Sequence, residues 1–192
     1  MKTVCGVGIT GNTPTIDENG VTLKSYTVWQ NMLLRCYNEN RHNIQPTYQL
    51  CTVHTDWHRY ETFKQWFNTH YREGYQLDKD ILCRNNSCYS PDTCCLVPRE
   101  INALIRSSNK SRGNTPIGVN FNKKRKKYHS HISINGFVKH LGSFDTPEEA
   151  FGVYKIAREQ YIKDMATKYF ENSMISLNVM NALHNWTVDI ND

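Results

Sequence analysis

The sequence predicts an α+β protein of two modules: an N-terminal module of helices and short strands, and a C-terminal three-stranded antiparallel sheet with one helix. Apolar residues recur every three to four positions between residues 25 and 70, and every second position between residues 117 and 144. The period of the hydrophobic pattern therefore changes from that typical of a helix to that typical of a strand. Between them lies SSNKSRGNT, residues 107–115, which has no apolar residue and predicts a linker.

Composition predicts a soluble, intracellular protein that is neither secreted nor inserted in a membrane. The 192 residues are 39% hydrophobic and 21% charged, which is ordinary for a globular chain. No apolar run approaches the length of a membrane span, and the first residues lack the apolar core of a signal peptide. The odd number of cysteines, seven, argues against a disulfide framework.

Four cysteines, Cys83, Cys88, Cys94 and Cys95, lie close together in the sequence and could bind zinc with a histidine. They do not form two CxxC pairs, and the last two would point to opposite faces of a strand. Structural thiols are therefore the favoured interpretation, and zinc is the less favoured metal.

Basic residues are concentrated in one segment of the chain. Residues 101–144 contain nine Lys and Arg residues and no Asp or Glu, so this segment carries a formal charge of +9. Since the net charge of the chain is +5, the remaining residues carry a net charge of −4. A basic module joined to a mildly acidic one predicts a polyanionic partner, most simply nucleic acid. The nine residues are Arg106, Lys110, Arg112, Lys123, Lys124, Arg125, Lys126, Lys127 and Lys139.

Two amphipathic helices are predicted before residue 74. The first begins at Ser25, which can cap it, and the second covers residues 55–70, with a loop at residues 41–47 between them. Their many aromatic residues could stack on bases, but helical spacing is more typical of a core. The apolar faces of the two helices are formed by Tyr26, Trp29, Leu33, Trp57, Tyr60, Phe63 and Phe67.

Residues 74–104 are the predicted site of chemistry. A short strand leads into Asp78, Lys79 and Asp80, a polar loop and a second strand follow, and Pro98 begins a helix. Acids at the end of a strand and an amide in the helix suit Mg²⁺ or Mn²⁺, because hard cations prefer oxygen ligands and retain several waters. An ordinary β-hairpin with solvated acids is the alternative.

The second module is predicted to contain strands at residues 117–122, 128–134 and 137–144. The basic turn, Lys123–Lys127, separates the first two strands, and Asn135-Gly136 is a two-residue hairpin signal.

Helix signals return after the third strand. Thr146 can cap a helix, Pro147 suits its first turn, and Glu149 completes a capping box. This helix is expected on the back of the sheet, and a short tail helix is expected at residues 173–184.

One face of the predicted sheet is polar. Ile132 and Ile134 must face the helix, so their alternating neighbours face outward. The two-residue turn predicts the pairs Ile134 with Phe137, Ser133 with Val138, and His131 with His140. The outward face then carries Asn120, Asn122, His129, His131, Ser133 and His140.

Such a face fits the major groove of double-stranded DNA, where Asn can pair with adenine. The basic turn and Lys139 would contact phosphates without reading sequence. A solvated polar sheet face is the alternative, and the charge distribution favours DNA.

Residues 117–157 resemble the APETALA-type, ethylene-response-factor DNA-binding domain. The resemblance rests on Gly118-Val119, Tyr128, His131-Ile132, Leu141-Gly142-Ser143-Phe144, Thr146-Pro147-Glu148-Glu149-Ala150, Tyr154 and Ala157. It implies that the sheet enters the major groove. The positions at which that family carries base-reading arginines hold Asn120, Asn122, Ser133, Val138 and His140.

Residues 26–104 resemble phage-encoded HNH homing-endonuclease-like proteins that carry such a domain behind the nuclease. The resemblance rests on Trp29, Arg35-Cys36-Tyr37, Pro46-Thr47-Tyr48, Trp57, Trp66, Leu77-Asp78-Lys79-Asp80, Tyr89-Ser90-Pro91, Val97-Pro98 and Asn102. Together the two resemblances imply a ββα-metal nuclease module at 1–106, a linker at 107–115, a DNA-binding domain at 116–170 and a tail at 171–192.

The HNH resemblance also implies roles for individual residues. Asp78 matches the acidic ligand of a single divalent metal, and Asn102 matches the ligand on the helix. Lys79 occupies the position of the general base. The central position falls near Tyr89, with Asn86 upstream.

A lysine in the general-base position is a departure from the HNH pattern. Neighbouring Asp78 and Asp80 should raise the pKa of Lys79, because they stabilise its charged form. Asp80 is itself a second candidate metal ligand. The base that activates water therefore stays open among His54, His58, Tyr89 and a second metal-bound hydroxide.

The leading hypothesis is a metal-dependent DNA endonuclease that acts as a monomer, with nicking of one strand as an expectation. The alternative is a catalytically silent, sequence-selective DNA-binding protein that keeps the HNH scaffold. A zinc-stabilised binding module is the third possibility.

Overall fold

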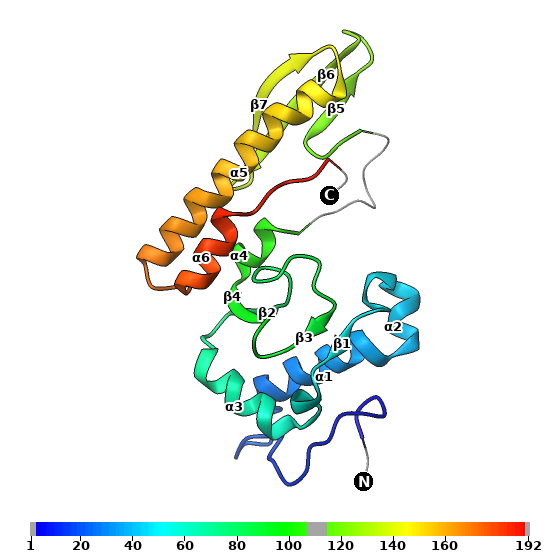
Figure 1. Ribbon diagram of the computed structural model, residues 1–192, viewed down its shortest axis with the longest axis vertical. Helices are drawn as coiled ribbons and strands as arrows, with labels where there is room; N and C mark the ends of the chain where they lie inside the picture. The colour runs from blue at the N-terminus through cyan, green and yellow to red at the C-terminus, as the bar shows by residue number, and fades with distance from the viewer. Residues whose placement is uncertain (1–2, 107–114, 191–192) are drawn as a thin grey trace. The chain divides into compact units, whose positions relative to one another are not determined.

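The computed structural model describes residues 3–106 and 115–190, and the chain divides into two compact units, Met1–Arg99 and Glu100–Asp192 (Figure 1). Most of the predicted linker, residues 107–114, lies outside the described residues. The division falls before the predicted linker, so helix α4 (Arg99–Leu104), expected in the first module, belongs almost entirely to the second unit. Each unit is described by itself below.

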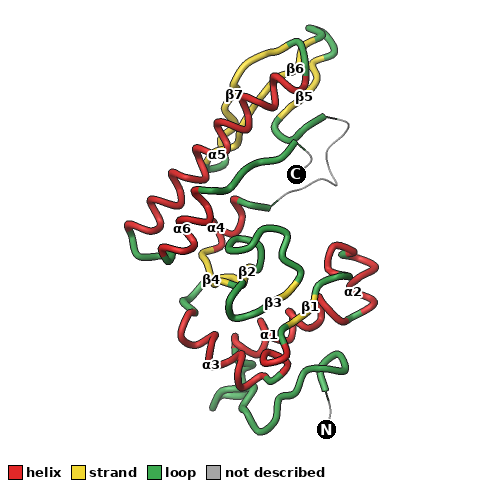
Figure 2. Tube along the Cα trace, in the orientation of Figure 1, coloured by secondary structure: helices red, strands yellow, loops and turns green. Residues whose placement is uncertain are grey.

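The first unit combines helices with two small two-stranded sheets (Figure 2). Strand β1 pairs with β3 in parallel, and β2 pairs with β4 in antiparallel orientation. The elements are α1 (Lys24–Tyr37), α2 (Glu39–Ile44), the 3₁₀ helix η1 (Pro46–Tyr48), β1 (Thr52–Val53), the 3₁₀ helix η2 (Thr55–His58), α3 (Tyr60–His70), β2 (Tyr75–Asp78), β3 (Cys88–Tyr89) and β4 (Cys95–Pro98).

Aromatic side chains form the core of the first unit, as their helical spacing predicts. Trp29, Trp57, Tyr60 and Phe63 are almost completely buried. The indole N–H of Trp29 donates to the carbonyl of Trp57 at 2.6 Å, so the polar atom of this buried ring is satisfied. These residues are therefore not available to stack on bases.

Three local predictions for this unit were wrong. Ser25 does not cap α1, because its hydroxyl is buried and hydrogen-bonds to the Tyr60 hydroxyl at 2.8 Å. The expected loop at residues 41–47 is largely helical, since Asn38 caps α2 by accepting from the Arg41 N–H. Pro98 ends β4, and α4 begins one residue later.

The second unit contains the predicted three-stranded antiparallel sheet, in the order β5 (Val119–Asn122), β6 (Lys127–Ile134) and β7 (Phe137–Phe144). The predicted register is confirmed, with Ile134 opposite Phe137, Ser133 opposite Val138 and His131 opposite His140. Asn135 and Gly136 have φ values of 51° and 83°, as a two-residue type I′ turn requires.

Helix α5 (Pro147–Glu171) covers one face of this sheet (Figures 1 and 2). The predicted capping box is present, with Thr146 and Glu149 bonded reciprocally. Gly118 has a φ of +76°, and a Cβ at this position would overlap the ring of Tyr154 on α5. Glycine therefore permits the close approach of the chain entering β5 to the helix.

Helix α6 (Leu177–His184) packs beside the second half of α5. Ser176 caps it, so the helix begins four residues later than predicted. After α6, the Val188 backbone is held by α5: its N–H donates to Glu159, and its carbonyl accepts from Lys155. In the part of the chain that the structure describes, no helix is both long and apolar enough to span a membrane.

Candidate functional site

Asp78 ends β2 and shapes the turn that follows it. Its Oδ1 accepts the backbone N–H groups of Asp80 and Ile81, each at 2.8 Å, while Oδ2 accepts no hydrogen bond from the described residues. Burial raises the pKa of this carboxyl, and the two N–H bonds oppose the shift without cancelling it. The site therefore presents one oriented, partly desolvated carboxylate oxygen.

Lys79 is tied into the loop after β2 and is not a free base. Its side chain is only 11% exposed, and its ammonium donates to Asp80 at 2.7 Å and to the carbonyl of Asn86 at 2.5 Å. Burial lowers the pKa of Lys79, but the hydrogen bond and charge of Asp80 outweigh this effect and the pKa is raised. This confirms the direction expected from the sequence. Lys79 therefore stays protonated at neutral pH.

Asn86 closes the same loop from the other side. Its amide nitrogen donates to the carbonyls of Lys79 at 3.1 Å and Cys88 at 2.5 Å, and its Oδ1 accepts the Cys88 N–H at 3.0 Å. The side chain thus joins the start of the loop to β3. Asn86 has the geometry of a positioning residue for this loop.

Asn86→Ala should destabilise the first unit by roughly 2–4 kcal/mol, because three hydrogen bonds that close the loop are lost together. For a unit of this size, that corresponds to a fall of roughly 10–20 °C in melting temperature. Thermal unfolding followed by circular dichroism would measure it. Asn40→Ala, at an exposed position of α2, is the matched control, and equal losses in the two variants would contradict a closing role for Asn86.

Tyr89 lies in the hydrophobic core of the first unit, which removes it from the candidate bases. It is almost completely buried, and burial raises the pKa of its phenol despite a hydrogen bond from Arg35. His58 is half-buried, with its Nε2 3.3 Å from the Tyr37 hydroxyl. His54 is 46% exposed, so it is the most accessible of these three candidates.

The backbone fixes His54 beside the end of the loop. Its N–H donates to the Tyr89 carbonyl at 2.8 Å, which extends the pairing of β1 with β3. The ring Nδ1 lies 3.4 Å from the Asp56 N–H and 3.7 Å from the Asp56 carboxylate. With the ring hydrogen on Nδ1, facing the Asp56 carboxylate, Nε2 would be the ring atom able to accept a proton.

The other predicted ligand, Asn102, is buried in α4 at 5% exposure. It belongs to the second unit, whereas Asp78 belongs to the first. Its role as a metal ligand stays a prediction.

The cysteine cluster does not form a preformed zinc centre in the described residues, where no group of three or more His, Cys, Asp or Glu side chains could share a metal. All seven cysteines are free thiols. Burial raises the pKa of Cys94 to about 12 and also raises that of Cys95. These two side chains are therefore neutral thiols rather than the thiolates that bind zinc.

A second candidate site is the sheet face opposite α5, here called the outer face. Its residues alternate with Ser130 and Ile132, which are buried toward the helix. By the strand register, the outer face comprises Asn120, Asn122, Lys127, His129, His131, Ser133, Val138, His140 and Ser143.

The register separates Lys139 from the other predicted DNA-binding residues. Lys139 lies opposite Ile132, so strand alternation directs it to the helix side of the sheet. The shift in register between Ser130 and His131 lies beyond this pair and does not change the assignment. His129 packs edge-on against His140, with ring centroids 5.3 Å apart, and its Nε2 is buried without a partner among the described residues.

The basic turn is shaped by Asn122. The Oδ1 of this residue accepts the N–H groups of Lys124 and Arg125, each at 3.1 Å. The acceptor atom that would read adenine is therefore already used, and Asn122 positions the turn instead.

Lys127 is not a free cation, because its ammonium lies 2.5 Å from the Asp145 carboxylate. The acid-free segment of the sequence ends at residue 144, one residue before this partner. The turn thus presents four exposed cations that have no ion-pair partner among the described residues: Lys123, Lys124, Arg125 and Lys126.

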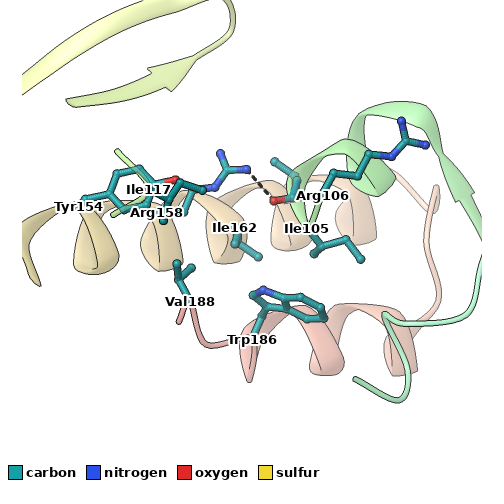
Figure 3. A pocket seen from close by; sticks show the side chains of 9 residues that line it. Ile105, Arg106, Ile117, Tyr154, Arg158, Ile162, Trp186 and Val188 are labelled. Atoms are coloured by element: carbon teal, nitrogen blue, oxygen red, sulfur yellow. Dashed lines mark hydrogen bonds between the residues drawn. The ribbon is translucent and has the colours of Figure 1, made fainter. Parts of the chain in front are cut away.

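A small cavity lies within the second unit, among Leu104, Arg158, Ile162, Trp186 and Val188 (Figure 3). Arg158 closes one side by donating to the Leu104 carbonyl at 2.6 Å. Its volume of about 30 Å³ suits a single water rather than a substrate, since small-molecule sites occupy roughly 300–1,000 Å³. The cavity instead marks where α4 is anchored to α5 and to the chain after α6.

Comparison with known proteins gave no match to a family model, to a curated protein or to a solved structure. The APETALA-type and HNH resemblances therefore stay predictions from the residues quoted for them.

Proposed function

We propose that the protein is a metal-dependent DNA endonuclease of the HNH type, whose outer face and basic turn bind double-stranded DNA. The observation that carries the proposal is the state of Asp78, a half-buried carboxylate with one oxygen fixed by two backbone N–H groups and the other without a protein partner among the described residues. An unpaired buried charge is costly unless a cation or a proton neutralises it.

The donor set around Asp78 fits Mg²⁺ or Mn²⁺ better than zinc. These ions need only one or two carboxylates from the protein and complete their coordination with water and phosphate oxygens. When bound, such a cation supplies charge stabilisation for the transferring phosphoryl group. The chain's own contribution is to orient Asp78 Oδ2 through the turn and to hold the loop shut through Lys79 and Asn86.

Within this proposal His54 is the general base. His54 is exposed, and an unprotonated imidazole nitrogen can accept a proton from a water molecule. The alternatives are less suitable, since Lys79 is held as an ammonium ion and Tyr89 is buried. The hydrogen bond from the His54 backbone to Tyr89 fixes the position of the imidazole relative to the loop.

Supercoiled plasmid relaxation tests the proposal with the full-length protein. We expect nicked circles in the presence of Mg²⁺ or Mn²⁺ and none in EDTA. His54→Ala should lower the rate by about 10²–10⁴-fold, the usual contribution of a general base, whereas His70→Ala, at an exposed position of α3, should leave it unchanged. Nicking that survives Asp78→Ala would overturn the assignment of Asp78 as a metal ligand.

A second candidate function is sequence-selective DNA binding without cleavage. The observation that favours it is the protonated Lys79 in the position of the HNH general base. Plasmid that remains supercoiled with every divalent metal tested, together with tight DNA binding, would establish this second function and reject the nuclease.

A further inference from the structure

Val138 is an apolar residue on an otherwise polar outer face. It is 70% exposed, and the register places it opposite Ser133, in the same alternation as His140. Its neighbour Phe137 lies opposite Ile134 and therefore points to the helix side. Val138 therefore lies outside the core and presents its two methyl groups on the outer face.

We infer that Val138 contacts the C5-methyl group of thymine, which makes the outer face selective for A·T base pairs. The inference rests on the proposed DNA-binding function of the sheet. In the major groove, thymine is the base that presents a methyl group, and a small apolar side chain recognises it by contact. Asn120, also exposed on the outer face, supplies the amide that pairs with the N6 and N7 atoms of adenine.

The charges and positions of the neighbouring side chains agree with selectivity for A·T base pairs. Lys127, which lies on the outer face opposite Asn122, is already engaged by the Asp145 carboxylate. The other outer-face residues include no arginine or lysine to pair with guanine and no carboxylate to accept from cytosine. Ser133 and Val138 face each other across adjacent strands, so their Cβ atoms are roughly 5 Å apart. This spacing allows both side chains to reach neighbouring base pairs.

The test compares two duplexes that differ only in the methyl group: alternating dA–dT and alternating dA–dU of equal length. We expect the wild-type protein to prefer the dA–dT duplex by about fourfold for each methyl contacted, the value of burying about one CH₂ group. In Val138→Ala the ratio of the affinities for the dA–dT and dA–dU duplexes should fall toward one. In Val138→Thr, which keeps one methyl group, this ratio should be intermediate. Fluorescence anisotropy at fixed salt would measure the four affinities that define each thermodynamic cycle.

Val21→Ala is the matched control, because Val21 is 61% exposed and belongs to the first unit. It should keep the wild-type preference. If Val138→Ala retained the full preference for the dA–dT duplex, the inference would be overturned, but the proposed DNA-binding function would stand. Absence of binding to either duplex would reject the proposed function as well. A Val138→Ala change that alters only self-association in sedimentation velocity would assign the residue to a protein interface and also overturn the inference.

Discussion

Asp78→Asn should make the protein more stable at neutral pH and unable to nick DNA. Asparagine keeps an oxygen that can accept the N–H groups of Asp80 and Ile81, so the turn is retained while the buried charge is removed. Loss of the carboxylate removes a metal ligand, and we expect nicking to fall by roughly 10²-fold or more. Stability and activity thus change in opposite directions at one residue.

The stability difference should depend on pH in a defined way. An aspartate in the unfolded chain titrates near ~3.9, and burial raises the pKa of Asp78 in the folded protein. Between these two pKa values the folded state binds more protons than the unfolded state, so the free energy of unfolding falls as the pH rises. Asparagine does not titrate. The advantage of Asp78→Asn therefore grows from about pH 4 upward and becomes constant above the folded-state pKa.

Thermal unfolding between pH 4 and pH 8, with and without Mg²⁺, measures this effect. Mg²⁺ should raise the melting temperature of the wild type and have no effect on Asp78→Asn, because a ligand stabilises only the state that binds it. Glu61→Gln is the control, since Glu61 lies at an exposed position of α3 in the first unit. A destabilised Asp78→Asn protein, or one that still nicks DNA, would show that Asp78 serves only to shape the turn.

Replacing the four cations of the basic turn, Lys123–Lys126, with alanine should weaken DNA binding by up to roughly 4,000-fold at 100 mM salt. Each cation that neutralises a phosphate releases a counterion, so the slope of log K against log salt should become shallower by about 3.6. The loss should be similar for all duplex sequences, because phosphate contacts carry no sequence information. Titrations at several salt concentrations would measure both quantities.

Asp145→Asn provides the opposite test of the same surface. Removing this carboxylate frees Lys127 from its ion pair, so the salt slope should steepen by about 0.9 and the affinity should rise by up to about eightfold at 100 mM salt. Asp164→Asn changes the net charge equally at an exposed position of α5 and should have a much smaller effect. Equal gains in the two variants would indicate a general charge effect instead of a specific role for Lys127.

Much of the second unit follows from local sequence signals. Asn135-Gly136 requires a tight turn, and that turn fixes the pairing of β6 with β7 residue by residue. Thr146 and Glu149 begin α5 through contacts within four residues. Such features depend on short-range hydrogen bonds and steric limits, so they can be predicted from the sequence.

The sequence did not predict features that depend on contacts between distant residues. The β1–β3 pair joins residues 52–53 to 88–89 through strands of two residues each, which is too short for any period to be recognised. Serine is a residue type that often caps helices, but the Ser25 hydroxyl is buried and hydrogen-bonds to Tyr60, 35 positions away. Asp145 follows the basic segment in the sequence, and only the pairing of β6 with β7 brings it to Lys127.

By itself, the sequence determined the fold class, the three-stranded sheet with its register and outer face, the concentration of positive charge and the rise in the pKa of Lys79. These properties arise from periodicity, turn chemistry and adjacent charges, which act over a few residues. Only the tertiary structure decided that Asn122 and Lys127 are already engaged, that Tyr89 is buried, and that one oxygen of Asp78 is fixed while the other has no protein partner among the described residues. The physical reason is that hydrogen-bond partners and desolvation are set by residues that only folding brings together.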